Sequence, residues 1–200
     1  MNPNKRPIFL VHGLWNNPKL FEKLIGKINE DDFQLYRPHL PHEFGKTSLR
    51  HLARDLDSKI EELVGSSIDI DIVGFSMGGL ISRIWLQNHH GFIRTKRFFS
   101  IGTPHLGTYT AQLIPPSFMP GLSDMKRGSH LISQLNNDLT SLEKVECISF
   151  YTNWDLMSFP GWQAKLSIGN SYHIPVLTHK ELITNSTSLD ILIEKIFKKV

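Results

Sequence analysis

Cysteine is nearly absent from this chain, whose 200 residues include a single one, Cys147. One cysteine excludes an intrachain disulfide, and its position in the apolar run 145–150 predicts a buried, unreactive thiol. Long hydrophobic runs are also missing: no segment reaches the length of a membrane span, and residues 1–7 lack the apolar stretch of a signal peptide. We therefore expect a cytoplasmic protein without an integral membrane segment.

The sequence also lacks a segment in which charged residues of one sign are concentrated. The chain has 22 Lys and Arg against 19 Asp and Glu, a net charge of +3 with histidine neutral. The clustered basic stripe that nucleic-acid binding requires is lacking, so we expect no nucleic-acid partner. The mild positive charge still permits peripheral contact with a lipid surface, whereas nothing in the sequence specifies the oligomeric state.

Short apolar runs, of the kind buried on both faces of a parallel sheet, alternate with amphipathic stretches. Strands are expected at 8–11, 33–36, 68–73, 97–101, 146–151 and within 165–174. Helices are expected at 19–28, 49–63, 77–88, 129–139 and 188–197. This alternation predicts an α/β fold of one domain, residues 1–200, with a mostly parallel sheet flanked by helices on both faces.

The longest irregular segment, residues 104–128, is rich in proline, glycine and serine. Long loops in compact domains are usually functional or mobile. We expect this segment to form a pocket wall or a lid, with the apolar side chains of Leu113 and Phe118 contacting the substrate.

The sequence Gly74-Phe75-Ser76-Met77-Gly78 lies between an expected strand and an expected helix. Five letters of this kind also arise by chance, as a glycine-rich turn with a surface serine. Between a strand and a helix, however, G-x-S-x-G is typical of a nucleophile elbow, a sharp turn that pushes the serine hydroxyl outward. We therefore predict that Ser76 is a catalytic nucleophile.

A serine nucleophile needs a histidine to take its proton and a carboxylate to orient that histidine. On a sheet of this type the chain order is serine, acid, histidine. Asp155 follows the strand 146–151 where it passes into a loop, so it is the predicted acid, a turn or cap aspartate being the alternative. His179 and His173 both come later. We favour His179, on a loop able to reach back over the serine, and leave His173, in or beside the last strand, as the competing base.

Backbone N–H groups are expected to stabilise the oxyanion of such a reaction. The predicted donors belong to Met77, directly after the nucleophile, and Leu14, in the loop after the first strand. In that loop His12, Gly13 and Trp15 are predicted to contact the substrate. A catalytic role for His12 is less fitting than a structural one, because it precedes the serine. Paired metal-ligand spacing is lacking, so we predict no metal and no other cofactor.

These motifs together resemble a known family. The residues that carry the resemblance are Val11-His12-Gly13, Asp71-Ile72-Val73-Gly74-Phe75-Ser76-Met77-Gly78-Gly79, Gly102-Thr103-Pro104-His105-Leu106-Gly107, Trp154-Asp155 and Thr178-His179. Their order and approximate spacing are similar to those of α/β-hydrolase lipases and esterases, especially small bacterial triacylglycerol lipases of the minimal kind. The resemblance implies a Ser76/Asp155/His179 triad that hydrolyses a small-molecule or lipid ester through an acyl-enzyme.

Two other functions remain compatible with the sequence. An acyltransferase would use the same triad, with an alcohol in place of water as the acceptor. A non-catalytic binding protein could use the same scaffold, although it would not need a complete triad.

Overall fold

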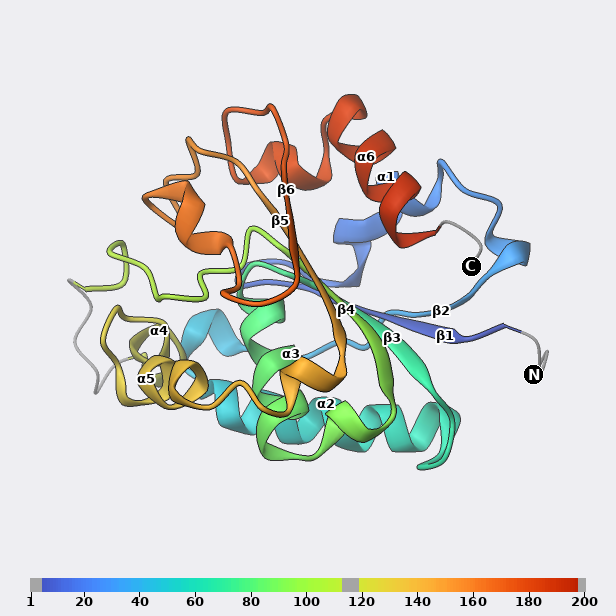
Figure 1. Ribbon diagram of the computed structural model, residues 1–200, viewed down its shortest axis with the longest axis horizontal. Coiled ribbons are helices and arrows are strands. Elements are labelled where there is room, and N and C mark those ends of the chain that lie inside the picture. The colour runs from blue at the N-terminus through green and yellow to red at the C-terminus, as the bar shows by residue number, and fades with distance from the viewer. Residues whose placement is uncertain (1–4, 113–118, 198–200) are drawn as a thin grey trace.

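The structure, a computed structural model, describes residues 5–112 and 119–197 (Figure 1). Its centre is a six-stranded sheet in the order β2-β1-β3-β4-β5-β6, in which all neighbouring strands are parallel. The strands are β1 (Pro7–Val11), β2 (Gln34–Tyr36), β3 (Ile70–Phe75), β4 (Thr95–Ile101), β5 (Glu146–Tyr151) and β6 (Asn170–His173). The expected parallel sheet is thus confirmed.

Helices cover both faces of the sheet, as expected (Figure 1). One face carries α2 (Leu49–Val64), α3 (Met77–Asn88), α4 (Pro120–Asp124) and α5 (His130–Asn137), and the other carries α1 (Glu22–Ile25) and α6 (Ser186–Ile196). Successive strand side chains point to opposite faces: Phe9 belongs to the core under α2 and α3, and Leu10 to the core under α1 and α6. Two buried faces explain why the strands are continuous apolar runs.

The helix expected at 19–28 is shorter and split. A 3₁₀ turn, Pro18–Phe21, begins after Asn17, whose side chain accepts a hydrogen bond from the Lys19 amide, and α1 ends at Ile25, directly before Gly26. Proline at the first helical position and glycine after the last one delimit this segment.

The irregular segment contains a helix that the sequence pattern did not predict. Its residues from Pro120 to Asp124 form α4, which buries Gly121 and Leu122. The Asp124 carboxylate accepts a hydrogen bond from the Leu49 amide at the start of α2, 2.9 Å away, so this part of the segment is tied to the body of the protein. Leu113 lies in the part of the segment, 113–118, that is outside the described residues.

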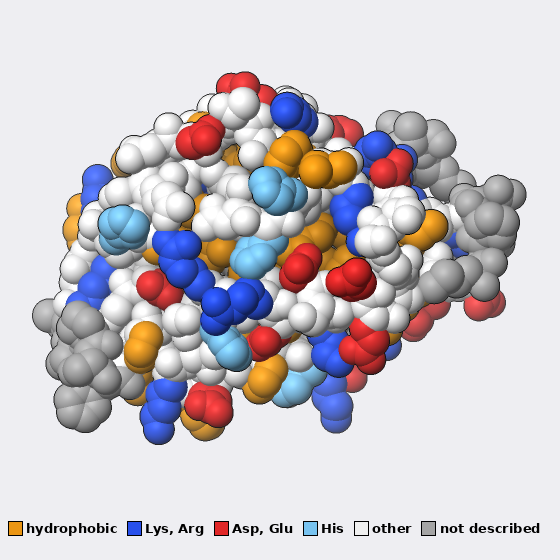
Figure 2. Space-filling model, turned by 90° about the horizontal axis from the view of Figure 1, so that it is seen from below, with side chains coloured by type: hydrophobic (Ala, Val, Ile, Leu, Met, Phe, Trp, Pro, Cys, Tyr) orange, Lys and Arg blue, Asp and Glu red, His pale blue; other side chains and the backbone are white. Residues whose placement is uncertain are grey.

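The surface and the remaining buried groups agree with an ordinary globular protein. On the face seen in Figure 2, side chains of both charge signs lie intermixed with several histidines. Cys147 is buried, and its burial raises the pKa of the thiol to about 12. In residues 5–112 and 119–197, no helix is both long and apolar enough to cross a membrane.

Candidate active site

The parallel strands end at one edge of the sheet, and Ser76 lies there in a sharp turn. It follows β3 directly, has φ 55° and ψ −124°, and precedes the first residue of α3. A positive φ is unusual for serine and is maintained only where the surrounding structure imposes it. The Ser76 amide donates to the carbonyl of Ile101 at the end of β4, 2.8 Å away, which anchors the turn to the neighbouring strand.

Glycines flank Ser76 because the strand, the turn and the helix touch one another. A Cβ atom on Gly74 would lie 2.4 Å from Cα of Gly79 in α3, and one on Gly78 would lie 2.2 Å from the carbonyl oxygen of Val11 in β1. Both separations are far inside van der Waals contact, so neither position accepts a larger residue without displacement of the backbone.

Gly78→Ala should therefore destabilise the protein by about 2 kcal/mol or more, the scale of an overpacked core. Urea unfolding of the two proteins would measure the loss. Gly26→Ala is the matched control, because its added Cβ would meet only the Glu22 carbonyl oxygen, at 3.2 Å, and should cost much less. Equal losses in both variants would contradict the argument from close approach.

Asp155 and His179 lie together although 24 residues separate them. The Asp155 side chain is fully buried, and its Oδ2 lies 2.6 Å from Nδ1 of His179. Its other oxygen accepts hydrogen bonds from the amides of Met157 and Ser158, at 2.8 and 3.1 Å. Because a carboxylate only accepts, Nδ1 of His179 carries the proton and Nε2 is left as the acceptor.

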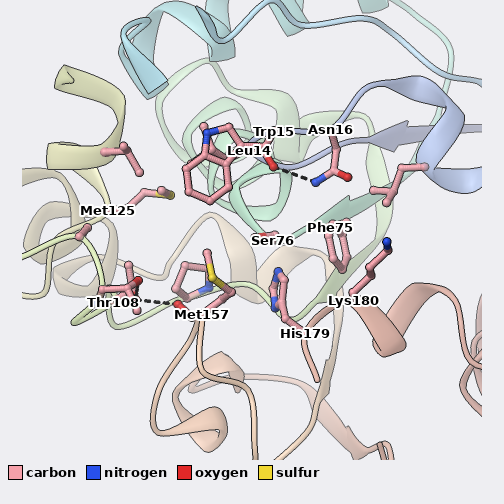
Figure 3. Close-up of a pocket in the computed structure, with 15 residues that line it drawn as sticks. Leu14, Trp15, Asn16, Phe75, Ser76, Thr108, Met125, Met157, His179 and Lys180 are labelled. Carbon is pink, nitrogen blue, oxygen red and sulfur yellow. Dashed lines mark hydrogen bonds between the residues drawn. The ribbon is translucent and has the colours of Figure 1, made fainter. Parts of the chain in front are cut away.

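Neighbouring residues hold the His179 ring in place. The ring packs against Phe75 with the centroids 4.8 Å apart. Gly102 also lies close to the ring, since a Cβ atom added to this glycine would be only 3.0 Å from Cε1 of His179. The Ser158 hydroxyl donates to the Gly102 carbonyl, 3.0 Å away, and so connects the Asp155 turn with the loop beneath the ring. Figure 3 shows the imidazole directed toward Ser76.

Glu181 fixes the turn that presents His179. Its carboxylate accepts hydrogen bonds from the amides of Leu177 and Thr178, at 3.0 and 2.9 Å, and the Thr178 hydroxyl accepts one from the Glu181 amide. This is the reciprocal pattern of a capping box. The backbone hydrogen bonds lower the pKa of Glu181. Its contribution to the order of the turn is therefore present above the ordinary glutamate range and is lost only as the pH falls through the lowered pKa.

Loss of the Glu181 carboxylate should misplace His179. If His179 is the base predicted from sequence, Glu181→Ala should lower kcat for an ester substrate by about tenfold, since small displacements of a catalytic group slow a reaction strongly. Glu181→Gln keeps an oxygen that can accept from both amides, so it should retain most of the activity. Steady-state kinetics of both variants would test this, and an alanine variant with wild-type kcat would contradict it.

The loop after β1 lies directly against Ser76. A Cβ on Gly13 would be 2.9 Å from Cβ of Ser76, so only glycine lets this backbone come so close. Gly13 thereby brings the backbone of this loop close to Ser76, and the Met77 amide lies at the first position of α3. The first amides of a helix have no partner within the helix and favour negative charge. This arrangement suits the predicted oxyanion donors.

His12 supports this loop from below and does not line the pocket. Its side chain is buried, its Nε2 accepts from the Leu40 amide at 3.1 Å, and its Nδ1 consequently donates to the Gly13 carbonyl at 3.1 Å. Burial lowers the pKa of His12 to about 4, so the ring is neutral at pH 7. The structural role fits these contacts, and direct substrate contact by His12, which we expected from sequence, does not.

A cavity of about 440 Å³ opens over the turn, and Ser76 and His179 both line it (Figure 3). Trp15, predicted to contact substrate, also lines it, whereas Gly13 is not among the lining residues. The irregular segment contributes Pro104, Thr108, Thr110, Ala111, Leu122 and Met125 to the wall. Leu113 and Phe118 lie outside the described residues.

His173, the competing base, lies elsewhere. It is the last residue of β6, at the exposed edge of the sheet, and its ring packs against Tyr151 with the centroids 5.4 Å apart. It is not among the residues that line the cavity. Within residues 5–112 and 119–197, no group of three His, Cys, Asp or Glu side chains could hold a metal ion.

The sequence matches one protein family over most of its length. Residues 6–141 match the family model described as alpha/beta hydrolase fold. This chain belongs to the α/β-hydrolase family. Among curated proteins, no sequence matches it significantly.

Solved structures share the fold of this α/β hydrolase. Aspergillus fumigatus lipase B has a TM-score of 0.81 and 18% identity over 99% of this chain, which spans only 54% of that lipase. Mature Bacillus licheniformis lipase BlEst2 has a TM-score of 0.74 and 15% identity, with 96% of this chain and 92% of that one covered. MGS-MChE2, an α/β-hydrolase enzyme from a lagoon-sediment metagenome, has a TM-score of 0.71 and 19% identity, with coverages of 98% and 91%. At such identities the likeness establishes the fold alone.

Two residues near this site, Glu181 and Arg83, were not singled out from sequence. Glu181 had a readable signal, because Thr178-His179-Lys180-Glu181 has the spacing of a capping box. Buried Arg83 had none: it donates to Nδ1 of His105 and to the Asn136 side chain, and so anchors the loop that carries Pro104 and Thr108 to the pocket. Burial lowers the pKa of Arg83 to about 10.

Proposed function

We propose that this protein is a serine hydrolase that cleaves carboxylic esters through an acyl-enzyme on Ser76. Membership of the α/β-hydrolase family supports a hydrolase in general. The observation that carries the narrower proposal is the hydrogen bond between Asp155 and His179. His179 lines the same cavity as Ser76, which lies in a strained turn. We also propose that residues 1–200 form a single domain.

The first half of the reaction forms the acyl-enzyme. Oγ of Ser76 attacks the ester carbonyl carbon while Nε2 of His179 takes the hydroxyl proton, and the carbonyl electrons move to oxygen. The amides of Leu14 and Met77 stabilise that oxyanion, and Asp155 stabilises the imidazolium. The intermediate then collapses, the bond to the alcohol oxygen breaks, and His179 gives its proton to the departing alcohol.

Water completes the cycle. His179 removes a proton from a water molecule, whose oxygen attacks the acyl carbon, and the second tetrahedral intermediate releases the acid as the proton returns to Ser76. No step requires a cofactor or a metal ion.

The pocket favours an ester with an apolar acyl group. Leu122, Met125 and Met157 supply apolar wall, and binding of an acyl chain there would remove apolar surface from water. Trp15 on the wall and Leu177 near His179 are exposed by 60% and 68%, which supports peripheral contact with a lipid aggregate.

The proposal is tested with a serine-directed fluorophosphonate followed by p-nitrophenyl esters of increasing chain length. We expect one labelled site, Ser76, and hydrolysis with a preference set by the apolar wall. Folded protein that is neither labelled nor active on any ester would overturn the proposal. Adding an alcohol acceptor and analysing the products separates hydrolysis from acyl transfer.

A further inference from the structure

The pocket has two chemically different ends. Thr108 and Met125 lie at one end and Asn16 and Lys180 at the other, with Ser76 between them (Figure 3). Among the described lining residues, Lys180 is the one lysine, arginine or acidic side chain, so it gives one end of the pocket a positive charge.

The chemistry of the proposed reaction assigns each end to one half of the ester. His179 must pass its proton to the departing alcohol oxygen, so the alcohol leaves on the side of the serine where His179 lies. Lys180 follows His179 in the chain and extends along Phe75, with its ammonium group directed toward the Asn16 side (Figure 3). The acyl group then occupies the opposite end of the pocket, where Met125 lies.

The ammonium group of Lys180 is not neutralised within the described part of the protein. The nearest acid in sequence, Glu181, is engaged by the amides of Leu177 and Thr178. Lys180 takes part in none of the ion pairs between described residues. A cation at the mouth of an apolar pocket is available for a ligand anion.

Asn16 adds a second polar group at the same end. Its Nδ2 donates to the Leu14 carbonyl, 2.8 Å away, and its backbone carbonyl lies 3.2 Å from Nε2 of His42. With the amide nitrogen held in this way, the Oδ1 atom is the group that can accept a hydrogen bond from a substrate hydroxyl. A cation and an acceptor together suit an alcohol that bears both an anionic group and a hydroxyl.

We propose that Lys180 is a specificity residue that binds an anionic group, phosphate or carboxylate, on the alcohol portion of the ester. The natural substrate class is then an acyl ester of an acidic, hydroxyl-bearing alcohol, with its apolar acyl chain against Met125. This inference rests on the proposed ester hydrolysis and narrows it to one kind of leaving group.

The test compares esters with the same acyl chain and different alcohols. One pair is a p-nitrophenyl ester and its analogue with a ring carboxylate; the other is a monoacylglycerol and the monoacylglycerol phosphate. The measured quantity is the ratio of kcat/KM for the anionic ester to that for its neutral counterpart. Lys180→Met should lower this ratio by about tenfold, the loss expected for one charge-assisted contact.

Two further variants sharpen the result. Lys180→Glu should lower the ratio further and favour an acylcholine, whose alcohol is cationic. Lys165→Met is the matched control, because Lys165 lines a separate hollow with Trp162 and Asn170. The ratio of kcat/KM values for this variant should equal that of the wild type.

The outcomes separate the two proposals. Ratios that are the same in wild type, Lys180→Met and Lys180→Glu, while esters are still hydrolysed, would overturn the role of Lys180 and leave ester hydrolysis intact. Absence of hydrolysis and of Ser76 labelling would overturn the proposed function itself. A fall in the ratio for one pair alone identifies phosphate or carboxylate as the recognised anion.

Discussion

Ser76→Ala should lower kcat for p-nitrophenyl esters by roughly 10⁴-fold or more and abolish fluorophosphonate labelling. The substitution removes the atom that is proposed to form the acyl-enzyme, while the apolar pocket and the backbone amides of Leu14 and Met77 remain. The protein should still fold, because alanine is smaller than serine and the side chain it replaces has room at the cavity wall. Steady-state kinetics, intact-mass analysis of the labelled protein and thermal unfolding measure the three quantities.

A matched serine variant controls for general effects of the substitution. Ser171 is exposed on the edge strand β6 and does not line the cavity, so Ser171→Ala should keep the wild-type kcat and labelling. Ser76→Ala protein that hydrolyses esters at the wild-type rate would show that another residue is the nucleophile. Labelling that persists in this variant would lead to the same conclusion.

His179→Ala should lower kcat by about a thousandfold or more, whereas His173→Ala should change it little. His179 bonds to Asp155 and lies on the cavity wall, but His173 ends an edge strand and packs on Tyr151. Without the imidazole, the Ser76 hydroxyl has no general base, and Asp155 keeps a buried carboxylate without its partner. Parallel kinetics of the two variants give a direct comparison.

The pH dependence adds an independent readout to this pair. In the wild type and in His173→Ala, kcat/KM should fall on acidification as the general base takes up a proton, and His179→Ala should lose that limb of the profile. If His173→Ala is the variant that loses the rate and the acid limb, the assignment of the base is wrong; this result does not test the serine or the aspartate.

Local patterns in the sequence were sufficient to predict the fold class, although not every helix. Runs such as 8–11 and 146–151 are apolar at consecutive positions because their strands are buried on both faces, and the alternation with helices left a parallel sheet as the consistent arrangement. Ser76 was also readable, because G-x-S-x-G between a strand and a helix is a local geometric requirement: the glycines are needed where backbone touches backbone. The glycines on either side of the serine therefore indicate, in the sequence itself, where two backbone segments touch.

Contacts between residues far apart in the sequence could be identified only from the tertiary structure. Sequence order left His173 and His179 as competitors, and the packing of the last loop against β5 put His179, not His173, at Asp155. Separate contacts, with the Leu40 amide and the Gly13 carbonyl, hold the buried ring of His12, and the last loop places Lys180 on the Asn16 side of the pocket. A single sequence carries no periodic signal for such encounters, because they depend on how separate loops meet at the edge of the sheet. The sequence alone determined the sheet and the sharp turn at Ser76, and the tertiary structure decided which side chains meet there.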